Sequence, residues 1–150
     1  MLFRSDLSVS CAQSLVGILS LSPRNLKVLD LTVALHYGEG ALEGFCEELE
    51  ALAGHNTLKA LFLTLHLCDN VDEIEYHIGP IMQDVENVLV KPGWSALKQV
   101  SFKVTMASWE NRAAELYEAL QSLPDEYLSH LSKLESVAFN FSTSVSEYCL

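Results

Sequence analysis

A short apolar phrase occurs four times in this chain of 150 residues, and its spacing restricts the fold more than any other feature of the sequence. In each copy, apolar residues follow an opening leucine at the third and fifth positions. The copies are LKVLDL (Leu26–Leu31), LKALFL (Leu58–Leu63), LKQVSF (Leu97–Phe102) and LESVAF (Leu134–Phe139). The opening leucines lie 32, 39 and 37 residues apart. A repeat of this length is typical of a unit made of one strand and one helix, whose copies stack to share a core.

The residues after each opening leucine alternate between apolar and other side chains. Fifteen of the sixteen residues at offsets +3, +5, +7 and +9 are apolar, whereas the offsets between them mostly carry Thr, Ser, Asn, Lys, His or Asp. Alternation with period two predicts strands that are buried on one face only. We place these strands near residues 27–36, 59–68, 98–107 and 135–144.

The segments between the strands have helical periodicity instead. One apolar stripe ends at Gly54, which we expect to be a helix C-cap, and a second contains Pro80, which we expect to begin a helix. A third stripe begins after Ser108 as an N-cap and stops at Pro124. The three stripes are Leu42, Phe45, Leu49 and Leu52; Ile78, Ile81, Val85 and Val88; and Trp109, Ala113, Leu116, Leu120 and Leu123. Residues 1–25 are predicted to form a helical N-terminal cap.

Strands that are joined by crossover helices lie parallel, so residues 1–150 are predicted to form a single α/β domain. A doubly wound sheet would have central strands that are apolar on both faces. Here the second face is polar. The pattern therefore predicts a leucine-rich-repeat-like arc of four parallel strands, with helices covering one face.

The four phrases and the irregular helical inserts between them resemble the degenerate leucine-rich-repeat region of fungal F-box-type proteins, from about Leu26 to the C-terminus. Two features depart from that pattern: the units exceed the usual length of about 20–29 residues, and no asparagine or cysteine ladder follows the strands. The segment before Leu26 is too short to contain an F-box. The resemblance implies a non-catalytic protein-binding module, the substrate-recognition part of an F-box-like ubiquitin-ligase receptor.

Charge restricts the classes of partner. The net charge is −11, and the segment Tyr37–Val90 contains eleven acidic residues against one basic residue, Lys59. Nucleic acids and acidic lipid surfaces require the opposite sign, so we expect neither as a partner. A protein partner is expected, with basic partners favoured. No apolar run approaches the roughly 18 residues that a membrane-spanning helix needs.

The four cysteines, Cys11, Cys46, Cys68 and Cys149, show no spacing typical of a metal site. The sequence therefore predicts neither a metal nor another cofactor. No dinucleotide, P-loop or hydrolase motif is present. Unpaired thiols and the lack of a secretion signal favour a reducing compartment, which we take as the cytoplasm, with the nucleus left open.

The polar face of the predicted sheet is the expected partner-binding surface. Alignment on the opening leucines places Phe62 between Asp30 and Ser101, and Asn140 beside Lys103. An aromatic side chain on this face would anchor an interface; the alternative is that another part of the chain covers Phe62. The predicted contact residues are Phe62, Thr64, His66, Lys103, Thr105 and Asn140. At the strand entrances, Lys27, Lys59 and Lys98 would form a column, which Glu135 interrupts.

Two further interpretations remain open. An enzyme would place its site at the C-terminal ends of the strands, around His36, His66, Cys68 and Asp69. Alternatively, the chain is a fragment of a longer solenoid. In that case the edges Leu26–Leu35 and Leu134–Thr143 would be exposed and would favour self-association.

Overall fold

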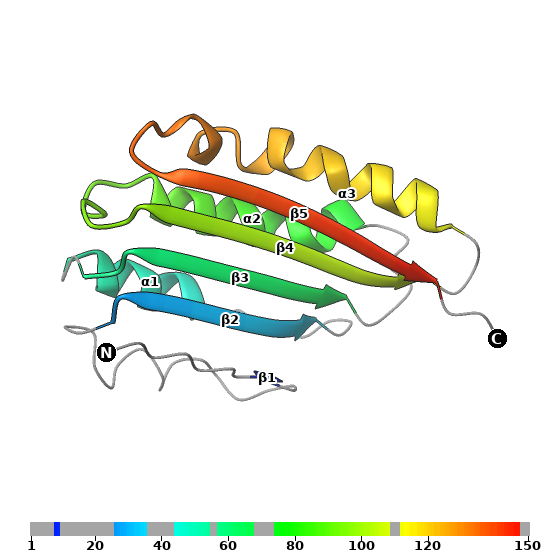
Figure 1. Cartoon of the computed structure of the whole chain (residues 1–150), viewed down its shortest axis with the longest axis horizontal. Helices are drawn as coiled ribbons and strands as arrows, with labels where there is room; N and C mark the ends of the chain where they lie inside the picture. Colours follow the sequence, from blue (N-terminus) through cyan, green and yellow to red (C-terminus); the bar gives the residue numbers. More distant parts are fainter. Residues whose placement is uncertain are drawn as a thin grey trace.

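Four long strands form the centre of the molecule (Figure 1). A computed structural model describes residues 8–9, 26–35, 44–54, 57–67, 74–108 and 112–147 of the chain. The strands pair in parallel in the order of the sequence. They are β2 (Val28–Leu35), β3 (Ala60–Leu67), β4 (Gln99–Ser108) and β5 (Ala138–Glu147). The predicted α/β class with parallel strands is confirmed.

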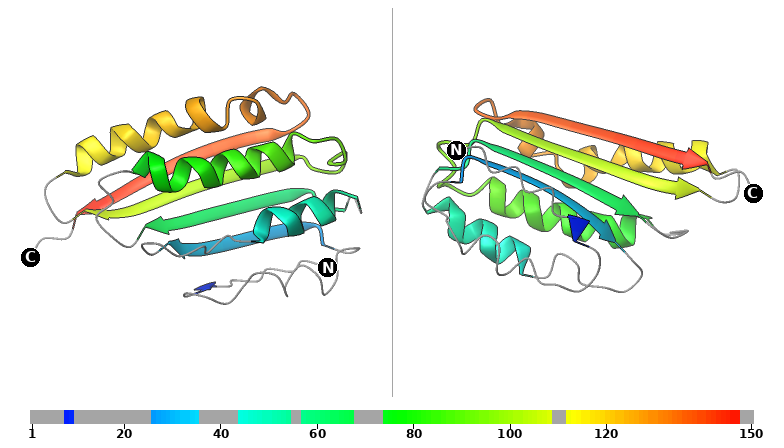
Figure 2. Two further views of the ribbon diagram at one scale, coloured as in Figure 1. Left: turned by 180° about the vertical axis from the view of Figure 1, so that it is seen from behind. Right: turned by 60° about the horizontal axis from the view of Figure 1, so that its bottom comes forward.

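The connecting helices all lie on one face of the sheet, as Figure 2 shows from behind and from below. They are α1 (Phe45–Ala53), α2 (Ile74–Leu89), α3 (Ala113–Tyr127) and the short 3-10 turn η4 (Leu131–Lys133). The strand order never reverses among the described strands, so each crossover returns to the same face. The prediction that helices cover a single face is therefore confirmed.

The core lies between the sheet and this helix layer. On β3, Leu61, Leu63 and Leu65 are at most 1% exposed, and they meet the buried helix residues Phe45 and Met82 in one apolar cluster. Burial of a leucine or phenylalanine side chain of this kind contributes about 1.5–3 kcal/mol. The side chains at alternate positions point away from the helices and form the second face of the sheet.

The helix boundaries differ from the predictions at both prolines. Pro80 lies inside α2 rather than at its start, and α3 continues past Pro124 to Tyr127, where Leu128 N–H closes the last turn on the Pro124 carbonyl at 3.0 Å. In α2, Met82 and Val85 beyond Pro80 are buried, and after Pro124 the half-buried Tyr127 and the buried C-cap residue Leu128 pack against the core. This packing outweighs the loss of one helical hydrogen bond. Ser108 ends β4 and is buried, so it does not cap α3.

The register of β5 also differs from the alignment on the opening leucines. Asn140 pairs with Ser101, and Ser142 pairs with Lys103, so β5 is displaced by two residues from the predicted rows. Leu134 lies in a turn, in which its carbonyl accepts the N–H of Val137 at 3.2 Å, whereas Leu97 is buried at the entrance to β4. A displacement of two leaves each side chain on its predicted face, which explains why the alternation did not reveal it.

The N-terminal segment contributes a strand that was not predicted. Ser8–Val9 forms β1, which pairs in parallel with Thr32 and Val33 on the outer side of β2. The sheet therefore has five strands rather than four. The rest of the predicted helical cap, residues 1–25, lies outside the described residues. The single-domain assignment remains a prediction.

Candidate functional site

The face of the sheet that no described helix covers carries mostly polar side chains. Three in-register rows cross it, and their β2, β3 and β4 members are those predicted from the alternation. The rows are Asp30, Phe62, Ser101 and Asn140; Thr32, Thr64, Lys103 and Ser142; and Ala34, His66, Thr105 and Ser144. We call this surface the open face.

Side chains on the open face are linked across neighbouring strands. The ring Nδ1 of His66 is hydrogen-bonded to Thr105 Oγ1, and Thr105 Oγ1 lies 3.5 Å from the Leu65 carbonyl, to which it donates. Asn140 Nδ2 donates to Ser101 Oγ at 3.5 Å. The predicted contact residues thus lie on adjacent strands of one surface, although Asn140 is next to Ser101 and not next to Lys103.

Phe62 and Lys103 contribute an aromatic ring and a positive charge to this polar surface. Phe62 is half-buried and lies in the row between Asp30 and Ser101, as predicted. Lys103 is exposed, in the next row of the neighbouring strand. Each long side chain can pack along its apolar atoms while its outer part stays available to a partner.

Charges are distributed differently on the two faces. Within the three rows, Asp30 and Lys103 are the oppositely charged side chains. The exposed acids of the described helices lie on the other side of the sheet: Glu47, Glu50, Asp84, Glu115, Glu118, Asp125 and Glu126. The open face therefore offers hydrogen-bonding groups and little net charge, and the acidic charge acts on a partner only at long range.

The lysine column at the strand entrances exists in the backbone. The Lys59 N–H donates to the Lys27 carbonyl at 2.7 Å, and the Lys98 N–H donates to the Lys59 carbonyl at 2.8 Å. All three lysines are exposed. The Ala138 N–H bonds to the Lys98 carbonyl, so Val137 and not Glu135 continues the column. Val137 is neutral, so it neither adds a fourth positive charge to the lysine column nor places a negative charge beside it.

The predicted enzyme site falls mostly outside the described residues. His36, Cys68 and Asp69 lie there, and of the four proposed members only His66 is described. Within the described part of the chain, no three His, Cys, Asp or Glu side chains are grouped so that they could hold a metal ion. No helix among the described residues is long and apolar enough to cross a membrane.

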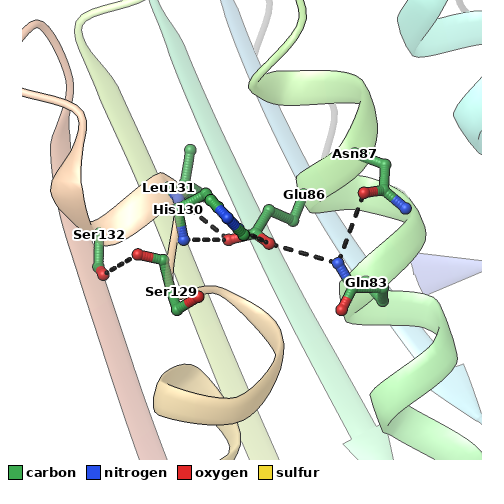
Figure 3. Close-up of polar contacts among 7 residues, drawn as sticks. All are labelled: Gln83, Glu86, Asn87, Ser129, His130, Leu131 and Ser132. Atoms are coloured by element: carbon green, nitrogen blue, oxygen red, sulfur yellow. Dashed lines mark hydrogen bonds and ion pairs between the residues drawn. The ribbon is translucent and has the colours of Figure 1, made fainter.

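A buried carboxylate forms a polar cluster that was not predicted (Figure 3). Glu86 on α2 is 2% exposed and accepts hydrogen bonds from the backbone N–H groups of His130 at 2.8 Å and Leu131 at 3.0 Å. Its other oxygen lies 3.2 Å from His130 Nδ1 and 3.3 Å from the amide of Gln83. The carboxylate thereby joins α2 to the segment that leads from α3 into η4.

The surroundings of Glu86 favour its ionised form. Burial alone would raise its pKa, but the N–H of Leu131, the ring and N–H of His130 and the charge of that ring together lower it. The His130 side chain is 77% exposed, and the pair joins no further acid, base or metal-ligating group among the described residues. The cluster therefore works as a structural connection between two helices, and the open face remains the candidate functional site.

Comparison of the chain with protein-family models, curated proteins and solved structures found no match. The leucine-rich-repeat resemblance accordingly stays a prediction. In the observed register, equivalent core positions Leu29, Leu61, Val100 and Phe139 lie 32, 39 and 39 residues apart. These units are longer than the standard repeat of about 20–29 residues.

Proposed function

We propose that the protein is a non-catalytic protein-binding module of leucine-rich-repeat type, and that the open face holds the partner. One observation carries the proposal: all the described helices lie on one side of the sheet, which leaves four long strands facing outward. Repeat proteins commonly use such a preformed surface for binding. The substrate-recognition role in an F-box-like ubiquitin-ligase receptor belongs to this proposal and rests on the sequence resemblance alone.

The strand order favours binding over catalysis. In doubly wound sheets, the active-site crevice forms where the order of strands reverses. The described strands follow one another from β1 to β5 without a reversal. The open-face side chains of β3 and β4 instead have in-register neighbours on both sides, which gives an ordered surface of hydroxyl, amide and imidazole groups around Phe62.

The chemistry of the open face defines the partner that it would accept. Serine, threonine and asparagine side chains donate and accept hydrogen bonds, so a polar protein surface with an apolar group opposite Phe62 would match it. The net charge of −11 accelerates the approach of basic proteins at low salt, and this effect falls as salt increases.

A pair of charge reversals tests the proposal. Lys103→Glu changes an exposed residue of the open face, whereas Lys133→Glu makes the same change at an exposed residue of η4, in the helix layer. In affinity capture from cell extract with quantitative mass spectrometry, we expect partners of the wild type to be lost from Lys103→Glu and retained by Lys133→Glu. Equal recovery by the two variants would place the binding surface elsewhere. Phe62→Asp, checked for folding by circular dichroism, should behave like Lys103→Glu.

A further inference from the structure

The two edges of the sheet differ in how they are paired. On one side, β1 covers part of β2. On the other side, the ten-residue strand β5 pairs with β4 alone among the described strands. A long edge strand presents a row of backbone donors and acceptors to which another strand can add.

The hydrogen bond at the start of β5 shows which backbone groups point outward. Ala138 donates its N–H to the Lys98 carbonyl at 2.8 Å, toward β4. The direction of the N–H and C=O groups alternates along a strand. Phe139, Phe141, Thr143 and Val145 therefore present their N–H and C=O groups to the free edge.

The apolar core continues to this edge without being fully covered. The side chains of Phe139, Phe141 and Val145 point to the helix side and pack against the core, but all three are half-buried. Their in-register partners on β4 are at most 3% exposed. The core thus ends in a strip of partly exposed apolar side chains along β5.

Helix α3 extends this strip. Gln121 is exposed and donates from Nε2 to Thr143 Oγ1 on β5 at 2.8 Å, so this side of α3 faces the strand. Tyr117 lies four residues earlier and therefore on the same side of the helix. It is 45% exposed, the larger exposure of the two exposed large hydrophobic residues in the described part of the chain.

The sequence of this edge strand lacks the charged residues and prolines by which proteins usually prevent strand addition. Residues 137–146 contain no charged residue, no proline and no glycine, and they are rich in aromatic and β-branched residues. This neutral segment belongs to a chain with a net charge of −11. It is therefore a place where two copies of the chain can approach with little local repulsion.

We propose that β5 pairs antiparallel with β5 of a second copy, about a two-fold axis at Ser142, so that a homodimer shares one continuous sheet. The sequence is self-complementary in this arrangement. Phe139 lies opposite Val145 and Phe141 opposite Thr143 on the helix side, so each strand covers the partly exposed strip of the other. These pairs are also the ones whose backbone groups point outward, and they would form about eight hydrogen bonds.

The β5 residues on the open face are also compatible with the antiparallel dimer. On the open face, Asn140 lies opposite Ser144, and polar groups again meet polar groups. The segment Ala138–Ser146 contains no charged residue, so the two paired strands bring no charges together. A closed two-fold dimer needs a single self-complementary edge, which β5 supplies. An interface made by one pair of strands is small compared with those of stable complexes, so we expect a dimer dissociation constant of about 1–100 µM.

Sedimentation velocity over about 1–300 µM protein tests the dimer, with three variants. Thr143→Pro removes an outward N–H, and with it the hydroxyl that accepts from Gln121, and leaves the backbone bonds to β4 in place. Tyr117→Ser removes the exposed ring from α3. Val90→Ser is the matched control, because Val90 is the other exposed large hydrophobic residue and lies at the end of α2. Circular dichroism confirms that each variant is folded.

We expect the wild type and Val90→Ser to dimerise alike, Thr143→Pro to raise the dissociation constant at least about tenfold, and Tyr117→Ser to raise it severalfold. A wild type that stays monomeric at about 300 µM would refute the dimer. A dimer whose dissociation constant is unchanged in both Thr143→Pro and Tyr117→Ser, with each variant folded, would also refute it. Oligomers larger than two copies that grow with concentration would indicate head-to-tail assembly and would refute it as well. The contact includes only the β5 members of the open face, whereas Phe62 and Lys103 lie on β3 and β4. Partner binding around Phe62 can therefore fail or succeed independently of the dimer.

Discussion

Replacement of Glu86 is the sharpest test of how the helix layer is held together. Its carboxylate is buried and accepts the backbone N–H groups of His130 and of Leu131, the first residue of η4. Glu86→Ala removes the acceptor. Glu86→Gln keeps one oxygen with nearly the same shape and removes only the charge and the second acceptor oxygen.

The two substitutions should differ in magnitude. Glu86→Ala leaves the buried N–H of Leu131 and the N–H of His130 without a partner, at about 1–3 kcal/mol each, and adds a small cavity. We expect a loss of about 3–5 kcal/mol. With Glu86→Gln, the new amide group must face His130 Nδ1 and the Gln83 amide, which now meet a donor. We expect a loss of about 1–2 kcal/mol.

The pH dependence follows from the lowered pKa of Glu86. An acid whose folded pKa lies below its unfolded value of about 4.3 stabilises the fold above that value. Its contribution is lost as the pH falls through the folded pKa. The stability difference between the wild type and Glu86→Gln should therefore be constant near neutral pH and should shrink below about pH 4.

Urea unfolding followed by circular dichroism, at neutral pH and at decreasing pH, measures these differences. Asp84→Asn is the control, because Asp84 is an exposed acid on the same helix and its replacement should change stability by at most about 0.5 kcal/mol. If Glu86→Gln unfolds at the wild-type urea concentration at neutral pH, the carboxylate does not hold the two helices together. A difference that stays constant at acid pH would contradict the assigned pKa shift.

Two further predictions concern side-chain packing. A Cβ on Gly79 would lie 2.5 Å from Cζ of Tyr127, so Gly79→Ala should lower the free energy of unfolding by about 1–2 kcal/mol, measured by urea unfolding. A Cβ on Gly54 would meet open space, so Gly54→Ala should be neutral or stabilising. Equal effects of the two substitutions would show that α2 and α3 do not approach closely at Gly79. Burial, and next the charge of Asp84, raise the pKa of the Cys46 thiol to about 11. The rate of Cys46 alkylation, measured by peptide mass spectrometry, should therefore increase about tenfold per pH unit from pH 8 to 10 and should be higher in Asp84→Asn. A rate that stops increasing near pH 9 would contradict the raised pKa.

The alternation of apolar and polar residues predicts the four long strands of the sheet, but neither β1 nor the register of β5. Because side chains alternate strictly between the faces of a strand, this pattern predicts the single helix-covered face and, with the alignment on the opening leucines, the neighbours of Phe62. The helical segments between the strands predict that the strands are parallel. Gly54 was also correctly placed as the C-cap of α1. These features depend on local periodicity, which each segment of the sequence contains by itself.

Features that depend on contacts between distant segments were not predicted. Local sequence predicts a helix boundary at each proline, because it does not show how strongly the residues around Pro80 and Pro124 pack against the core. Glu86 is one of the eleven acidic residues of Tyr37–Val90, and the sequence does not distinguish it from the others. Its partners are 44 and 45 residues away, and no pattern within α2 indicates them.

The register of β5 shows most directly what an alignment of repeats cannot decide, and it can be tested in solution. Neighbouring strands are about 4.8 Å apart, so the observed pair Ser101 and Asn140 lies within the Cα distance of about 4.4–6.8 Å that a disulfide spans. In that register, Lys103 and Asn140 are two residues out of step and about 8 Å apart, which is too far. The pair Ser101→Cys and Asn140→Cys should therefore form a disulfide under mild oxidation, detected by peptide mass spectrometry, and Lys103→Cys with Asn140→Cys should not. The opposite result would restore the register given by the opening leucines, and it would move the dimer axis proposed at Ser142, because the residues at the free edge would then belong to a different span of the chain.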